Sequence, residues 1–245
     1  MPNPSRSERA GDRTQNGRTQ QASRARKGTG PRIATSARVE TLQDRAHRLV
    51  ELARTRKKAL ILTHDNPDPD SIATALALAQ IFREKAGLES TVAYGGIIGR
   101  AENRALLRVL KLPVVPLSRV VFDEHDLIVI CDTQPEMGNH SLPSRYFPDA
   151  IFDHHPERPE SHLAAVAEVG GDYGATSTIA VEYLRALGVT PTREVATALF
   201  YGIKADPRAL GRETGDVDVD AYLWLFPLVD KDALAQIEHP RLPAA

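Results

Sequence analysis

Short apolar runs alternate with longer amphipathic stretches along most of the chain. The apolar runs lie within residues 58–64, 90–96, 126–133 and 149–156. The stretch 38–57 before the first run carries apolar side chains at helical spacing, among them Leu42, Leu49 and Ala53. Uninterrupted apolar runs are typical of strands buried on both faces, and helices between them supply crossover connections. The pattern therefore predicts an α/β fold with a mainly parallel β-sheet flanked by helices.

Further amphipathic stretches predict the remaining helices. One begins near Asp70 or Ser71 and ends at Gly87, and others cover residues 100–112, 174–188 and 192–206. Residues 216–230 contain Trp224, the only tryptophan. We expect this last stretch to be an amphipathic helix packed on the core, or the start of a connection to another domain.

Acidic and histidine side chains follow three of the predicted strands directly. His64, Asp68 and Asp70 come after the first, Asp132 after the third, and Asp153, His154 and His155 after the fourth. Because the carboxyl ends of parallel strands meet at one edge of a sheet, we expect these groups to converge. Any one of these residues could be an ordinary solvated loop residue. That explanation is much weaker for the whole set.

Converging carboxylates repel one another unless divalent cations bind between them. Cys131 is the only cysteine, so the ligands would be oxygen and imidazole nitrogen. That donor set favours Mn²⁺, with Mg²⁺, Fe²⁺ or Co²⁺ as alternatives. The candidate ligands are more than one ion needs, so two ions sharing a bridging carboxylate are predicted, a pair suited to phosphoester hydrolysis.

Four ordered motifs resemble those of the DHH phosphoesterases. They read "THDNPDPDSIA", "VICDTQP", "FDHHP" and "GATSTIA", and a fifth segment, "YGIKADPRALGRET", is similar to the one in which the family places its last metal-binding aspartate. The resemblance covers roughly residues 45–240. The family includes RecJ-like exonucleases, nano-RNase/pAp phosphatases, cyclic-dinucleotide phosphodiesterases and, more distantly, family II inorganic pyrophosphatases.

The resemblance implies a role for each matching residue. His64 and Asp68 would bind the first metal ion, Asp132 would bridge the two ions, and Asp70, His154 and Asp206 would complete the second site. His155 would face the substrate phosphate as a hydrogen-bond donor or general acid. Asp153 would orient one of the imidazoles.

Three further residues are candidate substrate contacts. Arg100 and Asn103 follow two glycines at the start of a predicted helix, where they could hold a phosphate; a tight turn before an exposed helix face is the alternative. Ser177, beside Thr176 at another helix start, could do the same, and plain helix capping is the alternative.

The chain departs from the family pattern at two places. Pro69 stands where the family usually has a glycine, and since proline forbids a positive φ, the backbone of this loop is expected to differ or to tolerate the change. The family usually continues into a second, substrate-binding domain where this sequence ends. We therefore expect a homodimer or another partner to supply the substrate clamp.

Residues 1–38 differ from the rest of the chain in composition. They carry nine Arg or Lys residues against Glu8 and Asp12, whereas the whole chain has a net charge of −1. With few large apolar residues, this segment is predicted to be disordered, and residues 39–245 to form the folded domain. The basic tail could contact nucleic acid, act as a solubilising leader or, less well supported by its pattern, be a transit peptide.

The leading hypothesis is a cytoplasmic Mn²⁺-dependent phosphoesterase that acts on short or terminal nucleotide phosphodiesters or on a 3′-phosphonucleotide. The single cysteine fits a reducing compartment, and no apolar run approaches the roughly 18 residues of a membrane helix. The alternatives are a non-catalytic nucleotide-binding or regulatory module and, third, a domain whose metal is only structural.

Overall fold

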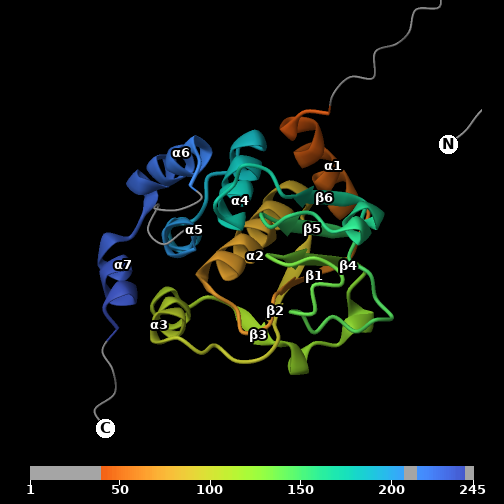
Figure 1. Ribbon diagram of the computed structural model, residues 1–245, viewed down its shortest axis with the longest axis horizontal. Helices are drawn as coiled ribbons and strands as arrows, with labels where there is room; N and C mark the ends of the chain where they lie inside the picture. The colour runs from red at the N-terminus through yellow and green to blue at the C-terminus, as the bar shows by residue number, and fades with distance from the viewer. Residues whose placement is uncertain (1–39, 207–213, 241–245) are drawn as a thin grey trace, which may run out of the picture. The chain divides into compact units, whose positions relative to one another are not determined.

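The computed structural model describes residues 40–206 and 214–240. The predictions for the tail 1–38 lie outside these residues. Within these described ranges, six strands form one parallel sheet in the order β3-β2-β1-β4-β5-β6 (Figure 1). The strands are β1 (Lys58–Thr63), β2 (Glu89–Tyr94), β3 (Val114–Pro116), β4 (Leu127–Cys131), β5 (Ala150–Asp153) and β6 (Val166–Val169).

The strand order reverses at the centre of the sheet. From β1 the chain moves outward through β2 to β3, then returns to place β4 on the other side of β1 and continues through β5 to β6. Thr63, the last residue of β1, pairs with Cys131, the last residue of β4. The loops that leave these two strands diverge, and in open parallel sheets such a switch point is where ligands bind.

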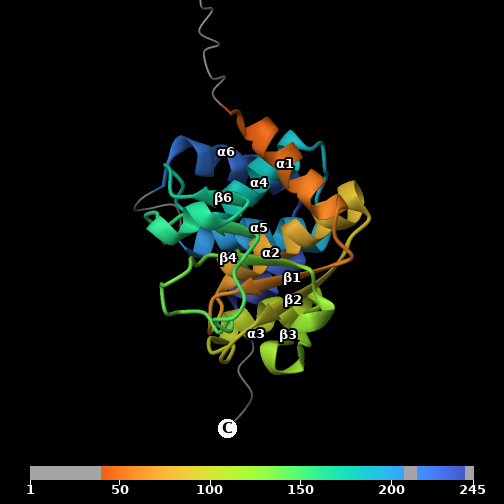
Figure 2. The same ribbon diagram turned by 90° about the vertical axis from the view of Figure 1, so that its right-hand side faces the viewer.

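The described part of the chain also contains seven α-helices: α1 (Leu42–Arg54), α2 (Pro69–Ile81), α3 (Ala101–Leu110), α4 (Thr176–Ala186), α5 (Arg193–Ala205), α6 (Asp216–Leu225) and α7 (Lys231–Glu238). All of them contribute buried residues to the same hydrophobic core, which also takes Ala59 and Ile61 from β1. Both views show α1 beside α4 and β6 (Figures 1 and 2). The predicted α/β class and parallel sheet are confirmed.

The opposite face of the sheet has a smaller core. Leu60 and Leu62, which alternate with the residues above, join Ala93, Ile130 and Ile151 there. Side chains from connecting segments, including Phe122 and Leu142, cover this face. Figure 1 shows these green segments on the side away from the blue helices α5–α7. Every described α-helix therefore packs on one face, and connecting segments, which include two short 3-10 helices, cover the other.

The start of α2 differs from the expectation. Its N-cap is Asp68, whose carboxylate accepts a hydrogen bond from the Ser71 amide, rather than Asp70 or Ser71. Pro69 occupies the first helical position, where its fixed φ is favourable and its missing N–H is not needed. The substitution of proline for glycine is thus tolerated in a helical backbone. After Ile81 the chain makes a π-helical turn over Phe82–Ala86 and stops at Gly87, with φ of 65°.

The short strands β3 and β6 and the helix α7 were not predicted from the sequence. They are three, four and eight residues long, which is too short for a clear apolar period. Residues 216–225 form the expected helix, α6, which buries Asp218, Ala221 and Leu225. Within the described ranges, no helix has the length and apolar character required to cross a bilayer.

Candidate metal centre

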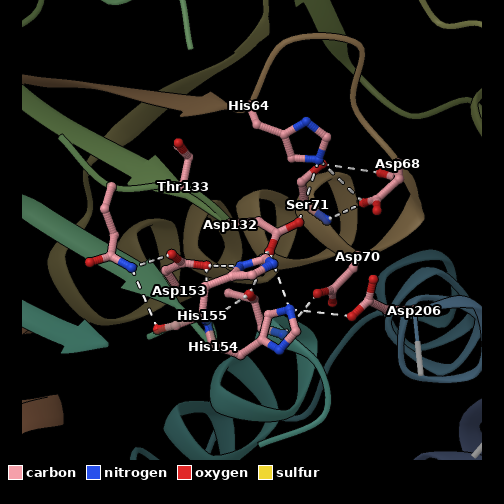
Figure 3. A network of polar contacts seen from close by, with 12 residues as sticks. His64, Asp68, Asp70, Ser71, Asp132, Thr133, Asp153, His154, His155 and Asp206 are labelled. Atoms are coloured by element: carbon pink, nitrogen blue, oxygen red, sulfur yellow. Dashed lines mark hydrogen bonds and ion pairs between the residues drawn. The ribbon is translucent and has the colours of Figure 1, made fainter. Parts of the chain in front are cut away.

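Side chains from five segments meet beyond the carboxyl ends of β1, β4 and β5 (Figure 3). His64 follows β1, Asp68 and Asp70 stand at the start of α2, and Asp132 follows β4. His154 and His155 follow β5, and Asp206 is the C-cap of α5. The structure thus brings together all the residues that the resemblance placed at metal ions, together with His155.

The first group consists of His64, Asp68 and Asp132, whose potential ligand atoms lie within 4.8 Å of one another. His64 Nε2 is 3.5 Å from Asp132 Oδ2 and 3.7 Å from Asp68 Oδ1. The other ring nitrogen of His64, Nδ1, lies 2.9 Å from the backbone oxygen of Asp65. That contact orients the ring so that Nε2 faces the carboxylates.

The second group consists of Asp70, His154 and Asp206, whose potential ligand atoms also lie within 4.8 Å of one another. His154 Nε2 is 3.2 Å from Asp206 Oδ2 and 3.7 Å from Asp132 Oδ1. Its Nδ1 lies 3.3 Å from the backbone oxygen of Tyr173. Asp132 therefore stands between the two groups, with Oδ2 toward the first and Oδ1 toward the second.

Asp70, a member of the second group, is fully buried. Its two carboxylate oxygens accept hydrogen bonds from the first amides of α4, those of Thr176 at 2.8 Å and Ser177 at 2.7 Å. The positive end of the α4 dipole thus supports a buried negative charge. Ser177 is itself fully buried, and its hydroxyl donates to the Asp70 backbone oxygen. This geometry differs from the expected substrate contact, because Ser177 faces Asp70 instead of the surface.

Asp132 adopts the left-handed backbone region with φ of 58°. A non-glycine residue there costs free energy, although aspartate and asparagine tolerate it better than most residues. Its amide donates to the Phe152 oxygen of the neighbouring strand, and its Oδ1 accepts a hydrogen bond from the Thr176 hydroxyl at 2.9 Å. The turn directs the carboxylate across the end of the sheet, between the two histidines (Figure 3).

The crowded charges shift several pKa values. Burial, together with the charges of Asp132, Asp68 and Asp206, holds the pKa of Asp70 well above its usual range. Burial and the neighbouring aspartates also raise the pKa of Asp206 to about 6, although His154 opposes this. Burial would lower the pKa of His64, but its contacts with Asp132 and Asp68 outweigh that effect and raise it to about 11. Without cations, the cluster favours bound protons.

Divalent cations fit this cluster better than protons do. His154 Nε2 is inaccessible to solvent and makes no hydrogen bond to the described residues, although Asp206 lies close enough for an ion pair. The cluster also consists of imidazoles and carboxylates, hard-to-borderline donors that suit Mn²⁺ and similar ions. His64, Asp68 and Asp132 would hold one ion, and Asp70, His154 and Asp206 would hold a second, with Asp132 shared.

Asp153 contacts His155 rather than a group at the centre of the cluster. Its Oδ1 lies 2.7 Å from His155 Nδ1, and its buried carboxylate raises the pKa of His155 to about 9. His155 also approaches Asp132 at 3.8 Å, yet 46% of its side chain is exposed. It can therefore contact both the cluster and a bound ligand.

Gln134 is a member of this network that the sequence analysis did not identify. Its fully buried amide donates to Asp153 Oδ2 at 2.7 Å and to the Pro156 oxygen at 3.1 Å. Its oxygen accepts from the Arg158 amide and the Ser161 hydroxyl. The only signal in the sequence is its place two residues after Asp132, in "CDTQP".

Arg100 and Asn103 stand beside the first group but differ in exposure. Both line a cleft of about 400 Å³ that also borders His64 and Asp68. Asn103 is buried and donates to the Pro67 oxygen at 3.1 Å, so it supports the loop that carries Asp68. Arg100 is exposed and is available to a ligand.

Comparisons with known proteins find similar sequences and a similar fold. Residues 58–203 match the DHH family, N-terminal domain. An uncharacterized protein of Methanocaldococcus jannaschii is 38% identical over 196 residues, which are 79% of this chain and 40% of that protein. A probable manganese-dependent inorganic pyrophosphatase of Bacillus cereus is 27% identical over 178 residues, 72% of this chain and 57% of that protein.

Among solved structures, an exopolyphosphatase-related protein from Bacteroides fragilis superimposes with a TM-score of 0.63. It is 15% identical, and the match covers 84% of this chain and 63% of that one. At this level of sequence identity, the comparison shows a similar fold and nothing more specific. The matched part of the chain spans about two fifths to three fifths of the length of the two sequence relatives.

Proposed function

The chain belongs to the DHH family, and from this premise we propose that it is a Mn²⁺-dependent phosphoesterase that uses two ions. The observation that carries the proposal is the pair of three-residue groups that lie side by side, with Asp132 of the first group 3.5 Å from His64 and 3.7 Å from His154 of the second group. A purely structural ion would not call for a second ligand set beside it. The name of the manganese-dependent relative from Bacillus cereus supports the choice of metal.

When bound, the two ions would lower the pKa of a water molecule and offset the negative charge of a phosphoryl group. The protein's own residues prepare the site for this. Asp70 is held by the amides of α4 and Asp68 by the amide of Ser71, so these carboxylates are fixed before an ion arrives. Such preorganisation lowers the cost of assembling the reacting groups.

His155 is placed to act as the general acid. Water adds to the phosphorus atom, the bond from phosphorus to the leaving oxygen breaks, and the leaving oxygen takes a proton from His155. The proton lost by the water passes to solvent. Asp153 holds Nδ1 of His155, so the other ring nitrogen can carry a proton toward the leaving group. The raised pKa of His155 keeps the ring protonated near neutral pH.

For the substrate we propose a nucleotide phosphodiester or a 3′-phosphonucleotide. Clefts of about 400 and 940 Å³ border the cluster, and both offer room for groups larger than phosphate. Arg100 supplies a guanidinium that can contact a phosphate oxygen. A non-catalytic nucleotide-binding module is the second candidate, because the same clefts offer room for a nucleotide that is bound without being hydrolysed.

Hydrolysis of bis(p-nitrophenyl) phosphate with and without Mn²⁺ tests this proposal. We expect Asp132→Asn to reduce the Mn²⁺-stimulated rate by at least about 100-fold, because both groups lose the shared carboxylate. Asparagine tolerates the positive φ at this position, so the fold should persist. The matched control is Asp220→Asn, which removes an exposed carboxylate from α6 and should leave the rate unchanged.

Unchanged turnover in Asp132→Asn would refute the mechanism. Calorimetric titration with a dinucleotide in Mn²⁺ separates the two candidates. Saturable binding without product over hours would favour the binding module, whereas product formation supports the phosphoesterase. A panel of pAp, di- to pentanucleotides, cyclic dinucleotides and pyrophosphate then identifies the substrate.

A further inference from the structure

Two clefts open beside different ends of the cluster. One borders His64 and Asp68 of the first group, and the other borders His154, His155 and Asp206. Figure 3 shows His64 and Asp68 at one end of the cluster and the two adjacent histidines at the other. A phosphodiester bound at the cluster has two substituents, so each cleft can receive one of them.

The cleft beside the first group adjoins another one of about 490 Å³. Arg100 and Asn103 line both, and Tyr201 and Lys204 of α5 and His239 after α7 line the second. We call this pair of clefts the Arg100–Tyr201 groove. It leads from Asp68 across the start of α3 to α5, and it is large enough for a nucleoside.

Several polar side chains in the groove have no hydrogen-bond or ion-pair partner in the part of the chain that the structure describes. Among the described residues, Arg100, Glu102 and His239 make no side-chain hydrogen bond or ion pair, and neither does the Tyr201 hydroxyl, although Tyr201 is half-buried. Lys204, in contrast, pairs with Glu238 at 2.6 Å. Hydrogen-bonding side chains of positive, negative and neutral charge lie here beside an aromatic ring. This mixture suits a nucleoside better than a chain of phosphates. A base can stack on tyrosine, and the N–H groups of the base and the hydroxyl groups of the sugar can donate hydrogen bonds to a carboxylate.

The position of His155 gives the substrate a direction. His155 lines the cleft at the far end of the cluster, away from Arg100. If His155 protonates the leaving oxygen, the leaving alcohol lies in that cleft. We infer that the Arg100–Tyr201 groove binds the nucleoside that remains attached to the phosphate, with its base against Tyr201. This inference rests on the proposed function for the identity of the scissile bond.

Two esters with the same leaving group test the inference. One is the p-nitrophenyl ester of thymidine 5′-monophosphate, which keeps its nucleoside on the phosphate, and the other is methyl p-nitrophenyl phosphate. We expect Tyr201→Leu to raise KM for the thymidine ester about tenfold, within the range of a lost base–aromatic stack, and to leave kcat unchanged. KM for the methyl ester should not change.

Arg100→Gln should raise KM for both esters, because Arg100 would contact the phosphate common to them. The matched control is Tyr146→Leu, a tyrosine on the loop-covered side of the sheet that stacks on Phe122. Equal effects of Tyr201→Leu on the two esters, or no effect on either, would overturn the inference.

Binding without turnover keeps this test separate from that of the proposed function. Calorimetric titration with thymidine 5′-monophosphate should show binding about tenfold weaker in Tyr201→Leu than in the unaltered chain or in Tyr146→Leu. If the unaltered chain hydrolyses neither ester in Mn²⁺, the proposed function fails, and this titration alone decides the groove. Equal affinity in all three proteins would reject it.

Discussion

At the scale of a single residue, Gln134 links the segment that follows β5 to the Asp153–His155 pair. Its amide nitrogen donates to Asp153, which in turn contacts His155, while its oxygen holds the Arg158 amide and the Ser161 hydroxyl. A buried amide with both ends bonded in this way fixes the orientation of its neighbours. The orientation of His155 therefore depends on a residue that does not contact the cluster.

We predict that Gln134→Glu lowers kcat for an aryl phosphodiester by about 10- to 100-fold, as expected for loss of a supporting hydrogen bond at a metal site. Glutamate keeps the acceptor for Arg158 and Ser161 but faces Asp153 with a second negative charge. Ser161→Ala is the control, since it removes a contact to Gln134 and leaves the bond to Asp153. Steady-state rates that fall equally in the two variants would contradict this role.

At the scale of elements, the packing of α5 against α2 determines how close the carboxylates on these two helices lie. Gly202 of α5 lies against the start of α2 and against Ser177 of α4. A Cβ added at Gly202 would lie 2.6 Å from Ser177 Oγ and 3.1 Å from Asp70 Cα. Glycine allows the two helices to approach this closely. The distance between Asp70, on α2, and Asp206, at the end of α5, is set by that contact.

Gly202→Ala is expected to lower the free energy of unfolding by about 1–3 kcal/mol, as overpacking does, even though alanine favours the helix. It should also weaken Mn²⁺ binding, because Asp70 and Asp206 move apart. Thermal unfolding and calorimetry with Mn²⁺ measure the two effects. Gly99→Ala is the control for stability, since a Cβ there meets no atom within 4 Å. An equal melting temperature for both variants would show that α5 adjusts freely.

The cluster affects the stability of the whole molecule, because folding forces carboxylates from distant parts of the chain together. In the metal-free protein the pKa of Asp206 rises from 3.8 to about 6 and that of Asp70 also rises. Between these pH values the folded state binds more protons than the unfolded chain. The free energy of unfolding should therefore fall as the pH increases from about 4 to 6.

Other groups do not reverse this sign within the window. His64 and His155 have folded pKa values of about 11 and 9, so they are protonated in both states below pH 6. The pKa of Asp68 is lowered, so this group opposes the slope mainly near pH 4, and burial lowers the pKa of His140, which opposes the slope only near pH 6. Urea unfolding of the metal-free protein at pH 4, 5 and 6 measures the slope. Asp206→Asn should reduce this dependence on pH, and Asp220→Asn should not. A free energy of unfolding that rises from pH 4 to 6 would contradict the prediction.

The chain order of apolar and polar residues was sufficient to predict the α/β class, the parallel sheet and the strand ends that carry the site. The signal was strong because each of β1, β4 and β5 is an apolar run followed at once by charged side chains. The features that were missed or misplaced include β3, β6 and α7, the N-cap of α2, the place of Gln134, and the buried role of Ser177. Short edge strands carry little periodicity, and several polar residues at the start of α2 could equally cap it.

The sequence by itself determined which residues can meet at one edge of the sheet, since alternating strands and helices leave few topologies for a parallel sheet. Only the tertiary structure decided how they meet. It placed Asp132 between two groups, used Gln134 to orient Asp153, and turned Ser177 inward to Asp70. These relations join residues separated by up to 107 positions, and they depend on helix packing and backbone conformation that local patterns do not encode.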